Sequence, residues 1–283
     1  MGRYTFSGHE SFYCKSLWLK KGYDAMKNGL NFNSPEAVAV LGVGKNMVAA
    51  IRFWLKSFAL VEEGRVTEFA EYIFDDRNGK DPFIEDIATN WLLHYQLVKN
   101  GTASIYHLVF LDFQREKKEF DTEQLLAFIK RKCSVPSLKS SYNENTVRKD
   151  IKVFLQNYVP PVEIKTIEDF TAILVDLGFV KQINKDKYLF VETKSADIDP
   201  LIILYTLLDI SREIGCNTLS FDTLQEIALT YGLSIAGLVE IIQNLQETRP
   251  DLLAYTDNSG IKNVQFLKNI DPYKVLDEYY STK

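Results

Sequence analysis

The sequence predicts a mainly α-helical protein built from tandem winged helix-turn-helix-like modules with small β-hairpins as wings. Apolar residues recur every three or four positions over much of the 283 residues, which is the spacing of an amphipathic helix. Two glycines, Gly42 and Gly232, each separate a shorter helical pattern from a longer one. A short hairpin pattern follows each longer helix. Helix, turn, helix and hairpin is the order of elements in a winged helix-turn-helix.

The first module is expected over residues 1–80. Ser34 is predicted to be the N-cap, and Pro35 the first helical residue, of a short helix that ends before the glycine turn. The next helix is predicted over Lys45–Leu60, with apolar residues along one side. Residues 61–67 then predict two very short strands around a glycine.

The same order is expected again in a C-terminal module over residues 196–283. Asp222–Gln225 has the spacing of a capping box and predicts a helix start, and Ser234 can cap the helix that follows the glycine turn. The two strands of its wing are predicted at Leu252–Tyr255 and Ile261–Leu267.

A helical middle region is expected over residues 81–195, with a further short winged unit near its end. Ser104–Phe113 is so apolar that it fits either a helix or a buried strand. A hairpin is predicted with its tip at Asn184–Lys187. The helices are predicted at Glu85–Lys99, Asp121–Lys132, Asn145–Tyr158 and Thr166–Leu177.

Composition narrows the setting in which the protein works. No stretch approaches the 18 or more apolar residues of a membrane span, and the N-terminus lacks the apolar block of a signal peptide. The three cysteines, Cys14, Cys133 and Cys216, are far apart and odd in number, which disfavours a disulfide framework or a metal knuckle. We therefore expect a cytoplasmic protein without a membrane partner.

The charge is distributed unevenly along the chain, although its total is only −5. Residues 1–60 hold eight basic and three acidic side chains, and residues 126–152 hold seven and two, so each block carries +5. A phosphate backbone responds to such local patches rather than to the total charge. The two blocks predict a partner in double-stranded DNA; the alternative is that they are ordinary solvated helix faces.

The Lys45–Leu60 helix carries the sharpest binding signal. Lys45 and Asn46 fall at its N-terminal end, where a recognition helix meets base edges. Arg52 and Lys56 lie four residues apart on one face and could follow the phosphates. We predict that these four residues bind DNA, against the alternative of a merely solvated amphipathic helix.

A second set of contacts is predicted at Arg148, Lys149 and Lys152, which share the Asn145–Tyr158 helix. The other cations of this basic block, at residues 130–132, end a helix, where the helix dipole alone favours positive charge. That structural reason does not apply to the first three.

Catalytic groups are concentrated in the segment Phe6–Phe12. His9 could act as a general base and Glu10 could hold a divalent cation, Mg²⁺ or Mn²⁺, if the protein is a nuclease. Lys15 follows closely and could lie near a bound phosphate. The alternative is that these groups cap the first helix and brace the module, because no carboxylate or second histidine can be paired with His9 from the sequence.

The chain contains five distinctive segments: Phe6–Phe12, Trp18–Gly22, Leu41–Val48, Asp81–Tyr95 and Thr146–Asp150. Together they resemble a bacterial family labelled as a domain of unknown function, DUF4007. The chain is also similar to the SspB proteins of bacterial DNA phosphorothioation and defence systems. That resemblance implies a protein that binds DNA and nicks one strand, beside sulfur-transfer enzymes as partners, so that sulfur can replace a phosphate oxygen. It supplies no catalytic residues.

Two classes of function therefore remain open: a metal-dependent DNA-nicking enzyme, and a non-catalytic DNA-binding or protein-interaction subunit that recruits modification enzymes. His9 and Glu10 are an incomplete metal site by themselves. The missing ligands would come from distant residues or from a second subunit, which leaves a homodimer open.

Overall fold

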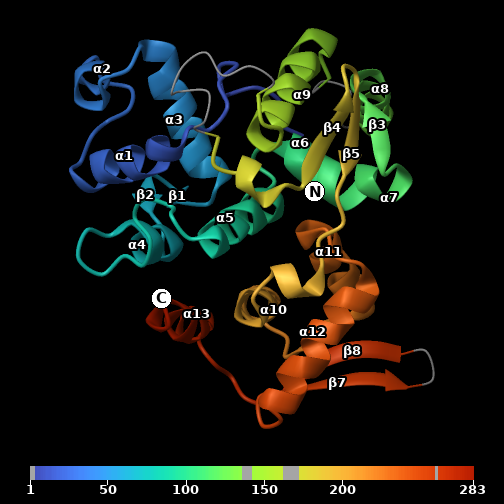
Figure 1. The fold of residues 1–283 in the computed structure, drawn as a ribbon. Coiled ribbons are helices and arrows are strands. Elements are labelled where there is room, and N and C mark those ends of the chain that lie inside the picture. Colours follow the sequence, from blue (N-terminus) through green and yellow to red (C-terminus); the bar gives the residue numbers. More distant parts are fainter. Residues whose placement is uncertain (1–3, 136–141, 162–171, 259–260) are drawn as a thin grey trace. The chain divides into compact units, whose positions relative to one another are not determined.

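The computed structural model describes residues 4–135, 142–161, 172–258 and 261–283. The chain divides into two compact units, Met1–Val191 and Glu192–Lys283. Both are mainly helical and carry small antiparallel sheets, as Figure 1 shows. The predicted division into three domains at residues 80 and 195 stays a prediction.

Unit 1 begins with three helices and a two-stranded hairpin, in the order predicted. Gly42 takes the left-handed conformation, with φ of 61°, that allows the tight turn between the second and third helices. The side chains of α3 that face inward, including Val48 and Ile51, are buried. These elements are α1 (Ser16–Lys27), α2 (Glu36–Leu41), α3 (Lys45–Ser57), β1 (Val61–Glu62) and β2 (Arg65–Val66).

The remainder of unit 1 packs around α5, which is buried on nearly every side. The Ser104–Phe113 segment is helical: α6 passes directly into a π-helix, so the strand alternative is excluded. Phe110 of this π-helix lies among the rings of His94, Tyr158 and Phe179. The helices are α4 (Glu68–Phe74), α5 (Ile87–Asn100), α6 (Ser104–His107), η1 (Leu108–Phe113), α7 (Gln114–Glu116), α8 (Thr122–Lys132) and α9 (Glu144–Tyr158).

A three-stranded antiparallel sheet closes unit 1. The predicted hairpin forms β4 (Val180–Asn184) and β5 (Lys187–Phe190), and β3 (Glu119–Asp121) pairs with the free side of β5. The sequence did not predict β3, because the alternation of apolar and polar residues that marks a strand cannot be recognised over only three residues. Of the helix predicted at Thr166–Leu177, residues 166–171 lie outside the described residues, and Val175–Leu177 form a 3₁₀ turn.

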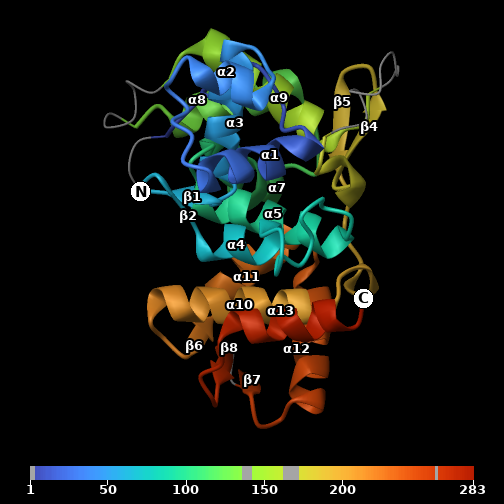
Figure 2. The ribbon, with the colours of Figure 1, turned by 90° about the vertical axis from the view of Figure 1, so that its left-hand side faces the viewer.

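Unit 2 contains a helix, turn and helix followed by a hairpin, and the hairpin gains a third strand to give the order β6-β8-β7. Gly232 adopts a left-handed conformation at the turn, as Gly42 does in unit 1. Helix α13 packs along α10, as Figure 2 shows. The elements are η5 (Ser195–Asp197), α10 (Pro200–Ile214), β6 (Thr218–Ser220), α11 (Phe221–Tyr231), α12 (Ile235–Thr248), β7 (Leu253–Asn258), β8 (Ile261–Phe266) and α13 (Pro272–Ser281).

Two local predictions about helix starts need correction. The capping box expected at Asp222–Gln225 does not form. Ser220, the last residue of β6, caps α11 and accepts from Thr223 N, so the helix begins two residues earlier than predicted. Pro35 occupies the N-cap position of α2 and not its first helical position. In the part of the chain that the structure covers, no helix combines the length and the apolar character needed to cross a membrane.

Candidate functional site

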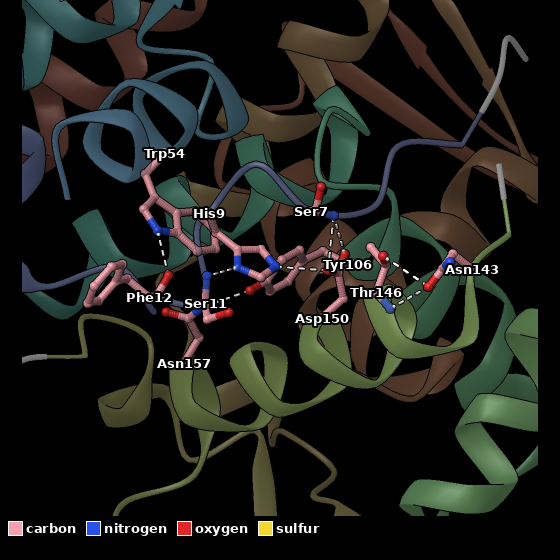
Figure 3. A network of polar contacts seen from close by, with 10 residues as sticks. All are labelled: Ser7, His9, Ser11, Phe12, Trp54, Tyr106, Asn143, Thr146, Asp150 and Asn157. Atoms are coloured by element: carbon pink, nitrogen blue, oxygen red, sulfur yellow. Dashed lines mark hydrogen bonds and ion pairs between the residues drawn. The ribbon is translucent and has the colours of Figure 1, made fainter. Parts of the chain in front are cut away.

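His9 is buried in the N-terminal loop and both of its ring nitrogens are engaged. Its Nε2 lies 2.9 Å from Asp150 Oδ1, and its Nδ1 accepts a hydrogen bond of 3.1 Å from Ser11 N. Because Nδ1 accepts, the proton is assigned to Nε2, which donates to the carboxylate. The ring is only 3% exposed. Sequence reasoning found no carboxylate for His9, and the structure corrects this: Asp150 of α9 is that partner (Figure 3).

Asp150 holds the loop through its other contacts as well. The N–H of Ser7 donates to both carboxylate oxygens, at 3.0 and 3.1 Å. With His9, this gives the carboxylate two donor groups from a loop more than 140 residues away in sequence. A buried carboxylate is stabilised when hydrogen bonds replace its lost hydration. Asp150 therefore fastens the loop to α9.

The loop has an unusual backbone that explains why its sequence is so specific. Ser7, Gly8, Glu10 and Ser11 all have positive φ, which side chains other than glycine adopt at a cost. A Cβ on Gly8 would lie 2.5 Å from the ring of Phe53, so only glycine fits there. This winding keeps His9 inside while the Glu10 side chain remains exposed.

Further hydrogen bonds extend the anchoring along the chain. Cys14 N donates to Asn157 Oδ1 at 3.0 Å, and Asn157 Nδ2 donates to the Tyr106 hydroxyl at 2.6 Å. Trp54 Nε1 donates to Phe12 O at 3.1 Å. Cys14 and Tyr106 are buried, and this burial raises the pKa of the Cys14 thiol and of the Tyr106 hydroxyl well above their usual values. They form a scaffold, and neither group is poised as a nucleophile.

A groove of about 780 Å³ lies beside α3 and next to this loop. Lys45, Arg52 and Lys56 line it from α3, and Gly8 of the loop contributes to the same lining. Residues 32–35 and Val38 form the facing wall, and the lining includes no acidic residue. Asn46 is exposed on α3 but is not part of the lining. The structure thus brings three of the four predicted α3 residues together around one concave surface.

The remaining predicted residues lie elsewhere. Lys15 is half-buried at the start of α1 with its ammonium 5.9 Å from the Trp18 ring centroid, and it does not line the groove. Arg148 is held by Glu123 and Glu144, at 2.5 and 3.0 Å. The same ion pair holds the pKa of Glu123 below its usual value. Lys149 and Lys152 are exposed and form no ion pair with any of the described residues.

Glu10 is the loop carboxylate that remains available to a ligand. The oxygens of Asp150 already accept three hydrogen bonds. Within the described ranges, no three His, Cys, Asp or Glu side chains are grouped so that they could hold a metal ion. Magnesium commonly keeps water and uses one or two carboxylates with substrate phosphates. Glu10 could therefore hold Mg²⁺ only together with oxygens of a bound phosphate.

The described residues define a two-unit, mainly helical fold that is shared with solved structures. An SspB crystal structure superposes with a TM-score of 0.85, and a magnesium ion-bound SspB crystal structure with 0.84. Each is 24% identical, and each match covers 98% of this chain and 88% of that chain. The chain belongs to the family of proteins of unknown function DUF4007, whose model matches residues 6–280. Among curated proteins, none matches this chain.

The His9–Asp150 contact gives a first test. Asp150→Ala should lower the free energy of unfolding by about 3 kcal/mol, because it leaves buried donors of His9 and Ser7 without an acceptor. The measurement is urea unfolding followed by circular dichroism. Lys149→Ala, an exposed neighbour on the same helix, should shift the midpoint little. Equal midpoints for Asp150→Ala and the wild type would show that the loop is not held by this carboxylate.

Proposed function

We propose that this protein binds double-stranded DNA through α3, as a component of a bacterial DNA phosphorothioation and defence system. The observation that carries the proposal is the groove beside α3, which Lys45, Arg52 and Lys56 line together and whose lining includes no acidic residue. Cations that release counterions from phosphates supply most of non-specific DNA affinity. The fold shared with SspB crystal structures supports the assignment to such a system, with sulfur-transfer enzymes as its partners there.

Both units are proposed to be winged helix-turn-helix modules. In unit 1 the order is α2, a left-handed glycine, α3 and the β1–β2 hairpin; in unit 2 it is α11, a left-handed glycine, α12 and the β7–β8 hairpin. In such a module the second helix faces DNA. Only α3 carries a cluster of cations on that helix; the described residues of α12 include no lysine or arginine. Unit 1 is therefore the proposed DNA-binding module.

We propose DNA nicking as the activity, with His9 and Glu10 at its centre. Gly8 lines the groove, and Glu10 lies two residues further along the same loop. His9 has both ring nitrogens bonded within the protein, so its role in the proposal is to position the loop and Glu10. That saturation equally favours the second candidate, a non-catalytic subunit that recruits modification enzymes to DNA.

Removing single charges from α3 tests the binding proposal. Lys45→Ala, Arg52→Ala and Lys56→Ala should each weaken duplex binding several-fold, and each should reduce the slope of log affinity against log salt by about 1. Fluorescence anisotropy of a labelled duplex over a range of salt concentrations measures both. Lys27→Ala is the matched control, because Lys27 is paired with Glu71 and lies outside the groove. Failure of the wild type to bind duplex at low ionic strength would contradict the proposal.

The predicted DNA contacts of α9, at Arg148, Lys149 and Lys152, are tested by substituting the paired arginine and the two lysines separately. The double variant Lys149→Ala/Lys152→Ala should weaken duplex binding and lower the salt slope by up to about 2 if both lysines meet phosphates. Arg148→Ala should change affinity less, since Glu123 and Glu144 already compete for that guanidinium. The same anisotropy titration distinguishes them. An unchanged slope for the double variant would remove α9 from the DNA contact.

Nicking is tested by conversion of supercoiled plasmid to open circle with Mg²⁺ or Mn²⁺. Glu10→Gln should abolish nicking while leaving folding and duplex binding intact, because the side chain is exposed. His9→Ala should reduce nicking together with stability, since it removes the anchor of the loop. Nicking at the wild-type rate by folded Glu10→Gln would remove this carboxylate from the chemistry. A wild type that never nicks, even with its system partners added, would establish the recruiting role instead.

A further inference from the structure

The groove beside α3 is lined by more than cations. Its facing wall includes three apolar side chains, half-buried Phe32 and exposed Pro35 and Val38. Phe53, also half-buried, projects from α3 between the positions of the cations. Three cations are enough to bind phosphates, and phosphate binding does not require an aromatic wall beside them. Aromatic faces between cations are the arrangement that proteins use to bind bases together with their phosphates.

The ring of Phe53 is held in place by its neighbours. Its centroid lies 5.2 Å from that of Trp54 and 5.8 Å from that of His9, with both pairs close to perpendicular. One edge of the ring also lies against Gly8, where a Cβ would clash at 2.5 Å. Phe53 is therefore a fixed surface, and its partial exposure faces the groove that it lines. A fixed aromatic surface loses little conformational entropy when a ligand stacks on it.

The facing wall also offers hydrogen-bonding groups for the edge of a base. Asn33 Oδ1 accepts from Arg52 Nη1 at 2.6 Å, while the Asn33 Nδ2 donors bond to no other described residue. Ser34 Oγ has no hydrogen-bond partner among the residues that the structure describes. Buried hydroxyls normally find a partner. Ser34 is part of the groove lining, so its hydroxyl is a candidate hydrogen-bonding group for a ligand there.

We propose that this groove accepts one unpaired nucleotide of a DNA strand. Its base would stack on Phe32 and Phe53, and its flanking phosphates would meet Lys45, Arg52 and Lys56. In an intact duplex the base faces are stacked on each other and cannot reach such a wall, whereas an unpaired base exposes both. The groove volume of about 780 Å³ falls within the usual range for small-ligand sites. This inference rests on the proposed DNA binding and narrows its substrate to a locally unpaired site.

Two matched probes test the inference: a perfect duplex, and the same duplex with one base opposite an abasic position. The wild type should bind the second at least about tenfold more tightly, since the base is already unpaired in that probe and binding does not have to break a base pair. Anisotropy titrations of both probes at one salt concentration give the ratio. Phe32→Ala should reduce the ratio to about one while binding to the perfect duplex is retained, and Phe32→Leu should retain part of it. Lys45→Ala should weaken binding to both probes by the same factor.

The possible outcomes distinguish failure of this inference from failure of the proposed DNA binding. Equal affinity of the wild type for both probes overturns the inference and leaves DNA binding intact. An equal loss on both probes for Phe32→Ala, in a variant that melts at the wild-type temperature, also overturns it, because Phe32 then contributes no recognition of an unpaired base. A wild type that binds neither probe overturns the proposed DNA binding and this inference with it.

Discussion

The buried hydrogen bond between His9 and Asp150 determines where the N-terminal loop lies, and the groove beside α3 depends on that placement. It joins residues 141 positions apart, and each side chain is only 4% exposed. Such a contact is stabilising only when the lone pairs and protons around it are satisfied. Ser7 N and Ser11 N complete the set, one on each partner. These bonds hold the loop in a backbone conformation that includes three non-glycine residues with positive φ, Ser7, Glu10 and Ser11.

The His9–Asp150 hydrogen bond affects the shape of the groove through aromatic rings that pack on His9. The His9 ring stacks near Trp54, with centroids 6.2 Å apart, and meets Phe53 edge-on. Trp54 is fully buried and also bonds to Phe12 O, so these rings have little room to shift. Phe53 therefore presents a constant face to the groove. A residue that sequence reasoning placed in the chemistry thus shapes the surface on which the proposed DNA strand would lie.

Sequence reasoning predicted the helices best where periodicity and glycine turns agreed. The α2–α3 and α11–α12 pairs were expected at nearly their observed positions, because Gly42 and Gly232 mark turns that need a left-handed residue. It did not find β3 and β6, which are three residues long and exist only because a hairpin distant in sequence pairs with them. The role of Asp150 was missed for the same kind of reason. The helix that carries it was noticed for its cations, and nothing in the local sequence shows that the Asp150 carboxylate turns inward.

The basic residues show why counting charge along the sequence is not enough to define a binding surface. Arg148 and Lys152 lie one turn apart on α9, yet Arg148 is engaged by two glutamates and Lys152 is not. Lys45, Arg52 and Lys56 are useful together because α3 directs them to one groove and because no acidic residue lines it. Residues 1–60 and 126–152 each carry a local charge of +5, yet they form two different kinds of surface. At α9 the charge is partly neutralised and exposed; at α3 it borders an apolar wall. Only the second combines charge with a shape that can distinguish one part of a DNA strand from another.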